Sequence, residues 1–587
     1  MEVFCVRLQI SRTKNAASLY VVKSTYIDGK HSSKIVEKLG TVAELEKKLN
    51  GRDPLEWAKE YIAEMTRLEK EQKREILIKY SPAKQIPKGE QRSFNGGYLF
   101  LQRIYHALEL NKICALIANK HNFEYDLNSI LSRLIYSRII YPSSKRAMCQ
   151  LSKRFIEQPN FELQHVYRAL GVIAEEADLI QSELYNRSLE LSARNTGILY
   201  YDCTNYFFEI EQEDGLKQYT QNAKDHKPNP VVQMGLFLDG DGIPLAFSIT
   251  DGNKNEQITL RPLEQKILRD FALSKFVVCT DAGLSSHANR LFNSMGERAF
   301  VTTQSVKKLK DYLKGWALYT EGWKLPGGDK LYDLSGFHKE RGEKGYLDPA
   351  DYRDKVFFKE RNIEVEGLEQ RLIVTFSLKY KDYQRKIRAR QVERAQRLIS
   401  KNPGKLKKPR QNDFKRFIVK KSVNEDVKEA KKTILSIDQE MIAREEIYDG
   451  FYAVCTNLTD DVAEIVKINK RRWEIEESFR IMKHEFKARP VYLQRDDRII
   501  AHFTTCFLSL VIFRYLEKLL REQYTCEEII DGLRDMDFLQ AKGEGYIPTY
   551  MRTNLTDDLH TIFGFRTDYE IVTNKQMKEA CKAAKKK

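Results

Sequence analysis

Residues 198–202 read Ile-Leu-Tyr-Tyr-Asp, an apolar run that ends in an acid, and this stretch decides the fold. Such a run, rich in branched and aromatic residues, predicts a buried β-strand. A Gly/Asp turn at residues 239–242 separates two further apolar runs, residues 231–238 and 244–249, and this pattern predicts a hairpin. The three runs therefore begin a sheet whose first strand carries Asp202.

A second acid follows a strand-like run in the same way. Residues 276–280 come after a helical stretch at 259–272 and lead directly into Asp281, and residues 298–303 are a fifth strand candidate. Because a helix that crosses between strands is typical of a mixed sheet, the fold class is predicted to be α/β. An acid at a strand end needs a partner or a metal, and Mg²⁺ binds carboxylate oxygens. Capping of the next turn is the simpler interpretation for either Asp alone.

A third acid lies in a charged segment that begins near residue 461 and is predicted to form one long helix. At about 100° per residue, four side chains project onto one helix face about 60° wide: Asn469, Arg472, Glu476 and Lys483. A carboxylate among cations suits a metal ligand flanked by phosphate-binding groups. A solvated face with ion pairs is the alternative, because this helix is charged on other faces too.

In this order, the two strand-end acids and the helix motif resemble the DDE transposases of bacterial insertion sequences. The resemblance is to the group whose signature helix carries Tyr, Arg, Glu and Lys, and Arg472, Glu476 and Lys483 stand at that spacing. Residues 489–492, Arg-Pro-Val-Tyr, are also similar to that group. Asn469 departs from it, because the signature has Tyr there, a residue associated with the cleaved DNA end. The resemblance therefore leaves open whether a hairpin intermediate forms.

The resemblance implies an RNase H-like catalytic core interrupted by an insertion between the second Asp and the Glu. It implies that Asp202, Asp281 and Glu476 are the catalytic metal ligands, holding two Mg²⁺ ions for which Mn²⁺ can substitute. Arg472 and Lys483 are then expected to bind DNA phosphates, with Arg480 a weaker candidate. The implied reaction is cleavage at the element ends, followed by attack of the freed 3′-hydroxyl on target DNA.

The chain is predicted to contain five segments. Residues 1–96 form a β-hairpin and a helix, a candidate for binding the DNA end, and residues 97–196 form an all-α segment. The catalytic core occupies residues 197–303 and 451–587, on either side of an insertion at 304–450. Within the insertion, residues 379–421 contain 17 Lys and Arg against three acids. This basic segment is predicted to bind DNA, with a solvated amphipathic helix as the alternative.

The composition excludes several classes of protein. The 587 residues include 99 Lys and Arg against 83 Asp and Glu, a net charge of +16, and 42% are hydrophobic. A folded basic chain of this kind points to a polyanionic partner. Nine scattered Cys without a C-x-x-C pair argue against a disulfide framework and a zinc site. The most apolar run, residues 503–513, is about half a membrane span, so a buried helix and no membrane are expected.

These features together predict a transposase of the bacterial cytoplasm, associated with the nucleoid. Its expected partner is double-stranded DNA, both the terminal inverted repeats and the target, and the resemblance implies a homodimer on DNA. Two alternatives stay open: a catalytically silent or domesticated DNA-binding protein, and a structure-specific nuclease on the same fold. All three acids are present, which disfavours the silent protein, and a nuclease would show no preference for inverted repeats.

Overall fold

The computed structural model of the chain describes residues 6–13, 16–27, 30–49, 52–72, 75–78, 80–220, 229–401, 413–423 and 432–587. The chain divides into two compact units. The first comprises Met1–Glu90 with Ala541–Glu544, and the second comprises Gln91–Gln540 with Gly545–Lys587.

The N-terminal unit is a three-stranded antiparallel sheet covered on one face by two helices. Its strands, in spatial order, are β1 (Val6–Thr13), β2 (Ala16–Ile27) and β3 (Lys30–Thr41), and its helices are α1 (Val42–Lys48) and α2 (Pro54–Gln72). The predicted hairpin is present as β2 and β3, whereas β1 was not predicted. Asp53 Oδ1 accepts the Leu55 N–H at 2.9 Å and so caps α2.

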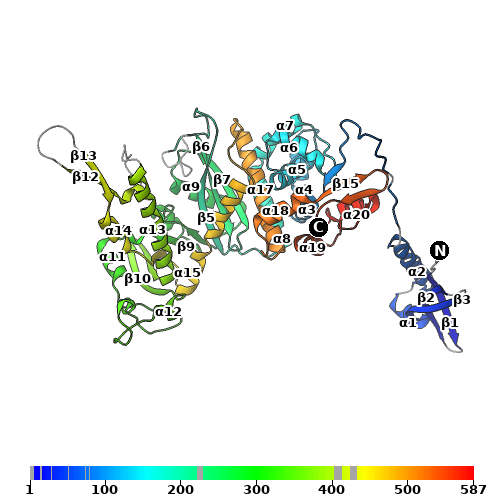
Figure 1. Ribbon diagram of the computed structural model, residues 1–587, viewed down its shortest axis with the longest axis horizontal. Coiled ribbons are helices and arrows are strands. Elements are labelled where there is room, and N and C mark those ends of the chain that lie inside the picture. Colours follow the sequence, from blue (N-terminus) through cyan, green and yellow to red (C-terminus); the bar gives the residue numbers. More distant parts are fainter. Residues whose placement is uncertain are drawn as a thin grey trace. The chain divides into compact units, whose positions relative to one another are not determined.

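Six helices form the predicted all-α segment and pack around a central buried helix (Figure 1). They are α3 (Tyr98–Ala107), α4 (Leu110–Lys120), α5 (Leu127–Ile140), α6 (Lys145–Leu151), α7 (Leu163–Glu175) and α8 (Ala177–Leu191). The central helix is α17 (Asp496–Leu519), which contains the apolar run 503–513. By length and composition α17 is able to cross a membrane, but 89% of its most apolar window is buried inside the protein. The predicted buried helix is confirmed.

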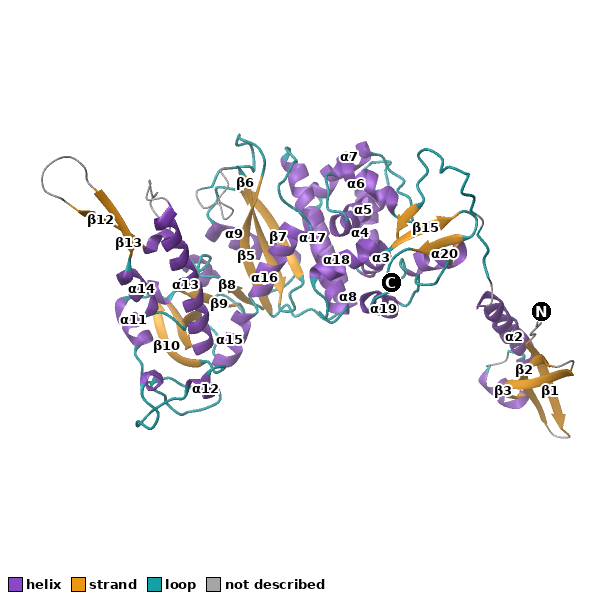
Figure 2. Ribbon diagram, in the orientation of Figure 1, coloured by secondary structure: helices purple, strands orange, loops and turns teal. Residues whose placement is uncertain are grey.

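The five core strands have the order and directions of an RNase H-like sheet (Figure 2). An antiparallel meander of β5 (Ile198–Phe207), β6 (Val231–Asp239) and β7 (Pro244–Asp251) comes first. Helix α9 (Glu256–Asp270) then crosses to β8 (Val277–Thr280), and α10 (His287–Phe292) leads to β9 (Ala299–Gln304). Strand β8 is parallel to β5, and β9 is parallel to β8. The spatial order β7-β6-β5-β8-β9 confirms the predicted fold class.

The predicted insertion at 304–450 contributes two strands to this same sheet. Beyond β9 the sheet continues through β14 (Phe451–Thr456), β11 (Leu368–Phe376) and β10 (Phe357–Val365), each antiparallel to its neighbour. The remaining elements of the segment are α11 (Asp311–Leu318), α12 (Pro349–Tyr352), α13 (Leu378–Lys401), β12 (Ile418–Val423), β13 (Lys432–Ile437) and α14 (Gln439–Glu446). Trp323 is fully buried in the core that these elements share with β14. The sheet therefore has eight strands.

The prediction of one long helix after residue 461 is wrong. The α-helix is interrupted at residues 471–472 and changes to a wider helical turn after residue 480. Helix α15 (Val462–Lys470) ends, α16 (Trp473–Arg480) begins after Arg472, and a wider helical turn follows at Ile481–Glu485. At the first break, the Arg472 N–H donates to the Asn469 carbonyl at 3.3 Å, a tighter turn than an α-helix makes. A projection at 100° per residue therefore does not describe how these side chains are arranged.

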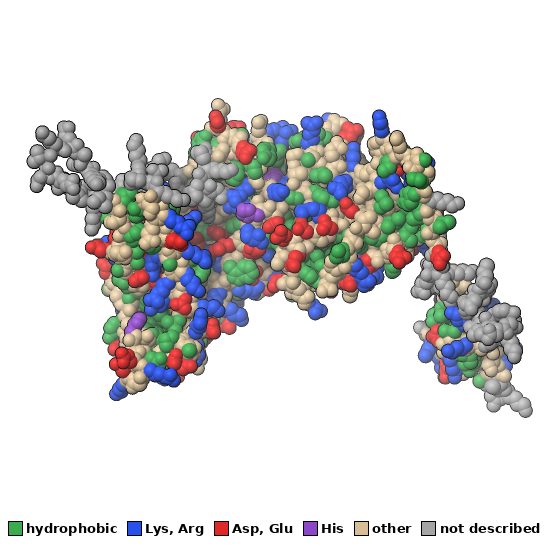
Figure 3. Space-filling view, in the orientation of Figure 1, with side chains coloured by type: hydrophobic (Ala, Val, Ile, Leu, Met, Phe, Trp, Pro, Cys, Tyr) green, Lys and Arg blue, Asp and Glu red, His purple; other side chains and the backbone are tan. Residues whose placement is uncertain are grey.

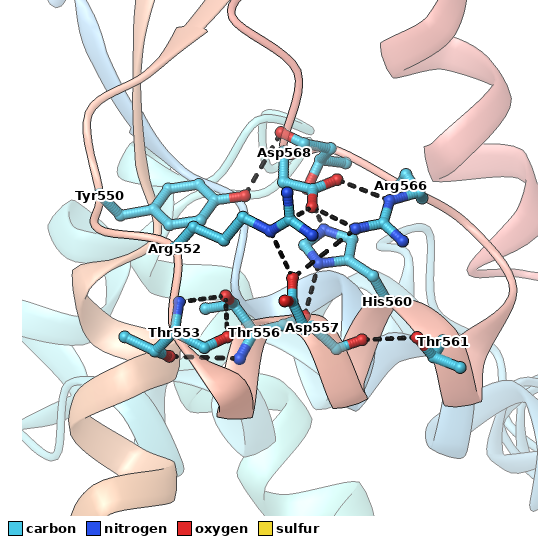
Figure 4. Close-up of polar contacts among 10 residues, drawn as sticks. Tyr550, Arg552, Thr553, Thr556, Asp557, His560, Thr561, Arg566 and Asp568 are labelled. Carbon is cyan, nitrogen blue, oxygen red and sulfur yellow. Dashed lines mark hydrogen bonds and ion pairs between the residues drawn. The ribbon is translucent and has the colours of Figure 1, made fainter.

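The C-terminal part is fixed by a polar network around α19 (Figure 4). Its elements are α18 (Cys526–Asp535), β15 (Asp537–Ala541), β16 (Gly545–Pro548), α19 (Asn554–Phe563), β17 (Val572–Thr573) and α20 (Asn574–Ala583), with β4 (Ser93–Asn95) pairing with β15. Arg552 and Arg566 both form ion pairs with Asp557 and Asp568. The buried His560 bridges the Thr556 carbonyl and the Thr567 hydroxyl.

Candidate active site

Neighbouring parallel strands bring the first two acids together. The register of β5 and β8 pairs Tyr200 with Cys279, so Asp202 and Asp281 lie side by side two residues further along each strand. Side chains alternate along a strand, and Tyr200 and Cys279 both belong to the core that packs under α16 and α17. The two acids therefore share the face of the sheet that meets α16.

Both aspartates are half-buried and are oriented by backbone N–H groups. Asp281 Oδ1 accepts hydrogen bonds from the N–H groups of Gly283 at 2.9 Å and Leu284 at 3.0 Å. Asp202 Oδ1 accepts the N–H of Cys203 at 2.8 Å. One oxygen of each carboxylate is thus fixed by the backbone, which orients the whole group.

Arg472 joins Glu476 to these two acids. It flanks the start of α16, and its Nη2 lies 3.2 Å from Glu476 Oε1. Burial alone lowers the pKa of Arg472, but the ionisable groups around the guanidinium raise the pKa above its usual range. Those groups are Tyr452, Glu476, Asp202 and Asp281. All three predicted acids therefore lie within the electrostatic reach of one arginine.

The donor set fits a hard divalent cation. Three carboxylates on two strands and a helix are the oxygen ligands that Mg²⁺ and Mn²⁺ prefer. In the described part of the chain, only one group of three metal-ligating side chains has its ligand atoms within 4.8 Å of one another, and it does not contain these acids. The three carboxylates are thus spread further apart, around the positive charge of Arg472.

Lys483 approaches the same face from the wide turn after α16. Its Nζ donates to Thr204 Oγ1 at 2.6 Å, and it lies 5.5 Å from the centre of the Tyr206 ring. Thr204 is on β5, two residues after Asp202, so Lys483 sits close to the first acid. Sequence spacing had grouped Lys483 with Arg472 on one helix face, whereas in the structure a tertiary contact with Thr204 on β5 positions Lys483.

Arg480 makes its contacts elsewhere. It forms ion pairs with Glu477 at 2.7 Å and with Glu485 at 3.2 Å, and its side chain is 47% exposed. Hydrogen bonding to Glu477 raises the pKa of Arg480. None of these contacts reaches the three acids, so Arg480 is the sequence-predicted residue least connected to the site.

Asn469 and Tyr452 form a buried polar contact that sequence spacing does not signal. Asn469 Nδ2 donates to the Tyr452 hydroxyl at 2.8 Å, and that hydroxyl lies 2.7 Å from Thr303 Oγ1. Asn469 is buried at the end of α15, whereas Tyr452 is on β14. The position where the signature has a tyrosine therefore holds an amide that contacts a tyrosine from another element. Tyr452 is also one of the ionisable groups that raise the pKa of Arg472.

A cavity of about 600 Å³ opens beside Arg472 and Glu476. Its walls combine aromatic rings with cationic side chains: Tyr380, Tyr383, Tyr452, Trp473, Lys379 and Lys470. Trp473 is 60% exposed and Tyr383 58% exposed, so both rings are accessible from solvent. Rings for stacking beside cations for phosphates are the lining expected where a nucleic acid strand binds.

Another cluster of potential metal ligands lies away from this site. His121, Glu175 and Glu176 have ligand atoms within 4.8 Å of one another. Glu176 already pairs with Lys120 at 2.6 Å and with His121 at 2.7 Å. Since a lysine neutralises the buried carboxylate, an ion-pair cluster explains these residues.

The basic segment 379–421 is partly neutralised within the protein. Arg388 is buried against Asp449, with contacts of 2.7 and 2.6 Å, and Arg416 pairs with Glu445 at 2.8 Å. Residues 402–412 of the segment lie outside the described residues. On the face drawn in Figure 3, positive and negative side chains are interspersed.

A comparison with protein families finds a match over the segment that contains the third acid, Glu476. Residues 352–512 match the family described as Transposase DDE domain. This segment is similar to a transposase DDE domain. The matched part of the chain contains Arg472, Glu476 and Lys483, whereas Asp202 and Asp281 precede it.

Among solved structures, the chain is similar to a piggyBac transposase synaptic complex with hairpin DNA, determined by cryo-electron microscopy. The two are 8% identical, with a TM-score of 0.36, and the match covers 83% of this chain and 90% of that one. No curated protein matches the sequence. The RNase H-like fold is assigned from the strand order of the core sheet.

Proposed function

We propose that this chain is the transposase of a bacterial insertion sequence, acting in the cytoplasm on the ends of its own element. It cleaves the DNA at those ends and transfers the 3′-hydroxyl to target DNA as a DNA-bound homodimer. One observation carries the proposal: Asp202 and Asp281 stand at the same level of two neighbouring parallel strands, and Arg472, which pairs with Glu476 at 3.2 Å, is within electrostatic reach of both. The transposase DDE domain over residues 352–512 supports it.

Asp202, Asp281 and Glu476 would hold the divalent cations. Such cations supply electrostatic stabilisation of the attacking and leaving oxygens in phosphoryl transfer. The backbone N–H groups at Gly283 and Leu284 keep the Asp281 carboxylate oriented toward the site. Arg472 neutralises the acids in the free protein, and a cation there would release its guanidinium for a DNA phosphate.

The surrounding side chains would position DNA beside the acids. Lys483 binds a phosphate next to the scissile bond, with Thr204 holding its ammonium group close to Asp202. The aromatic and cationic cavity next to Glu476 accommodates the adjoining nucleotides. No covalent enzyme–DNA intermediate is needed, because water and the 3′-hydroxyl are sufficient nucleophiles for two successive displacements.

The test is cleavage of supercoiled plasmid carrying the DNA that flanks the reading frame, by the purified full chain with Mg²⁺ or with EDTA. Asp202→Asn and Glu476→Gln are each expected to abolish cleavage at the flanking DNA, because each removes one anionic ligand. Glu477→Gln is the matched control. It makes the same change one residue along α16, where the side chain pairs with Arg480.

Three outcomes would contradict the proposal. If both variants still cleave the flanking DNA, the assignment of Asp202 and Glu476 as metal ligands is wrong. DNA binding without cleavage in Mg²⁺ or Mn²⁺ would favour the catalytically silent protein. Cleavage of junctions or ends without any preference for the flanking repeats would favour the structure-specific nuclease.

A further inference from the structure

The wide turn that carries Lys483 is closed by two backbone hydrogen bonds. The Phe486 N–H donates to the Ile481 carbonyl at 3.0 Å, and the Ala488 N–H donates to the Met482 carbonyl at 2.9 Å. The first of these bonds spans five residues, as in a π-helix, whereas an α-helical bond spans four. Because residues of a wider turn rotate less about the helix axis, the turn changes the direction in which Lys483 points. Whatever holds this turn therefore also holds the lysine.

Two buried side chains, from helices α5 and α17, hold the end of this turn. Arg138 of α5 donates from Nη1 to the Phe486 carbonyl at 3.1 Å. His502 of α17 places Nε2 3.1 Å from the Ala488 carbonyl. Arg138 is 6% exposed and His502 is 7% exposed, so both hydrogen bonds lie inside the protein. We call these two side chains the helical clamp.

The His502 imidazole donates to the Ala488 carbonyl in its neutral form. A carbonyl oxygen only accepts hydrogen bonds, so the proton of the neutral ring lies on Nε2. Burial lowers the pKa of His502 well below its usual range, and the nearby charges of Arg138 and Lys145 lower it further. His502 therefore stays neutral near neutral pH, and its hydrogen bond to the turn is retained there.

Arg138 binds the backbone and no carboxylate. Its Nη2 donates to the Ser143 carbonyl at 3.3 Å, and it forms no ion pair with any residue that the structure describes. A charged donor makes a stronger hydrogen bond to a carbonyl than a neutral donor does. Arg138 thus joins two loops, one after α5 and one after the wide turn, through their carbonyl groups.

Only a short segment separates the clamp from the active site. Lys483 precedes Phe486 by one short stretch of the turn, and its ammonium group donates to Thr204 on β5 at 2.6 Å. On the other side of the clamp, the Val491 N–H donates to the Phe207 carbonyl at the end of β5, at 3.1 Å. Residues 483–491 are thus held by β5 and by the two helices.

We infer that the helical clamp, Arg138 and His502, positions Lys483 for the reaction. The clamp fixes the end of the wide turn, and the turn keeps the lysine ammonium group beside Thr204, close to the first acid. Both clamp side chains are buried and bind the backbone, so their influence on DNA cleavage passes through Lys483. The inference rests on the proposed function for the role of Lys483 at a DNA phosphate.

The first measurement needs neither DNA nor metal. The full chain is treated briefly with acetic anhydride, and peptide mass spectrometry gives the acetylation rate of each lysine. Arg138→Met and His502→Leu are each expected to raise the rate at Lys483 about fivefold, the change that loss of one hydrogen bond allows. His502→Gln, which keeps a side-chain N–H donor, should return the rate close to that of the unmodified chain. The rate at Lys359, a buried lysine of the insertion, should not change.

The second measurement is a double-mutant cycle on single-turnover cleavage of the flanking DNA. His502→Leu is expected to slow cleavage about tenfold while DNA affinity in EDTA stays unchanged. In the Lys483→Ala background the same substitution should cause little further loss, because residues that act through one group are not additive. His560→Leu is the control and should cleave at the unmodified rate, since this buried histidine of the same unit binds Thr556 and Thr567 instead. Thermal unfolding followed by circular dichroism checks that each variant is folded.

Three results would overturn the inference. They are an unchanged acetylation rate at Lys483 in both clamp variants, an equal rise at Lys359, and additive losses of cleavage in the cycle. The proposed function is judged separately, by the loss of cleavage in Asp202→Asn and Glu476→Gln. If those variants lose cleavage while the clamp variants keep the acetylation rate of Lys483, only the clamp assignment is wrong. If the unmodified chain does not cleave, the acetylation rates still decide whether the clamp holds Lys483.

Discussion

The hydrogen bond between Asn469 and Tyr452 is the contact on which the arrangement around Arg472 depends. Asn469 is buried, and its amide donates to a hydroxyl that also meets Thr303. Tyr452 also lies within electrostatic reach of Arg472, the residue that all three acids share. The Asn469–Tyr452 hydrogen bond thus joins the end of α15 to β14 beside the predicted catalytic centre.

Tyr452→Phe is expected to lower the free energy of unfolding by about 1–2 kcal/mol, because it leaves the buried Asn469 donor without a partner. It should also slow cleavage of the flanking DNA without weakening DNA binding, since Arg472 loses a neighbour but no DNA-binding group is removed. Urea unfolding and single-turnover cleavage measure the two effects. Tyr380→Phe is the control, since its ring lies edge-on to Tyr452 at 6.1 Å. Wild-type stability in Tyr452→Phe would contradict the role of this hydrogen bond.

Helix α13 is fixed to the sheet by one buried ion pair. Arg388 donates two hydrogen bonds to Asp449, which immediately precedes the turn into β14, and both side chains are buried. The pKa of Arg388 is raised, chiefly by this hydrogen bonding. A buried charge that loses its partner cannot be solvated, so removing one member costs more than the pair contributes.

Arg388→Met is therefore expected to destabilise the protein by about 3 kcal/mol. The double variant with Asp449→Leu should recover much of this stability, because no unpaired charge then remains. Urea unfolding measures both. Arg385→Met is the control, since Arg385 is 55% exposed and lies 3.9 Å from Asp449. A double variant as unstable as the single one would show that packing, and not charge, holds α13.

Within the described part of the basic segment, α13 has an exposed cationic face that is available to DNA. Lys386 and Arg390 are exposed, whereas Arg388 between them is buried. Lys386→Ala with Arg390→Ala is expected to flatten the log–log salt dependence of DNA binding by roughly 0.9 for each phosphate that the variant no longer neutralises. Anisotropy titrations with duplexes of unrelated sequence measure this slope. Lys575→Ala with Lys578→Ala on α20 is the control, and an unchanged slope in the α13 variant would identify a solvated helix face.

At the scale of the whole molecule, a single acid connects three distant parts of the larger unit. Glu109, at the start of α4, forms ion pairs with Lys112 at 2.6 Å, Arg187 of α8 at 2.6 Å and Lys587 at 2.9 Å. These contacts lower the pKa of Glu109 to about 2, with Lys112 the largest cause. The folded protein therefore releases this proton more readily than the unfolded chain does.

The lowered pKa of Glu109 makes the stability of the folded protein depend on pH. Stability contributed by Glu109 is fully present above about pH 4.5 and is lost as the pH falls toward about 2. Glu109→Gln is expected to be less stable at pH 7 and to lose less stability between pH 5 and pH 3 than the unmodified chain. Urea unfolding across this pH range measures the difference. Glu124→Gln, an exposed acid of the same unit, should keep the unmodified profile. If the free energy of unfolding falls with pH equally in Glu109→Gln and in the unmodified chain, Glu109 is not the source of this pH dependence.

The sequence by itself determined the elements whose signals are local. Apolar runs that end in an acid identified β5 and β8, periodic apolar residues identified an all-α segment before them, and the buried α17 followed from its composition. These predictions were correct because strand and helix periodicity are properties of a few consecutive residues. The spacing of Arg472, Glu476 and Lys483 likewise lies within one short segment.

Only the tertiary structure decided which distant residues meet. The helix is interrupted at Arg472, and Lys483 contacts Thr204 on another element. Tyr452 contacts Asn469. Arg388 pairs with Asp449. The tertiary structure also extended the core sheet through the predicted insertion, since β11 pairs with β14. Contacts of this kind depend on strand register and on packing between segments far apart in the chain. No periodicity along the sequence encodes them, because their energy comes from burial and from charges that only the folded chain brings together.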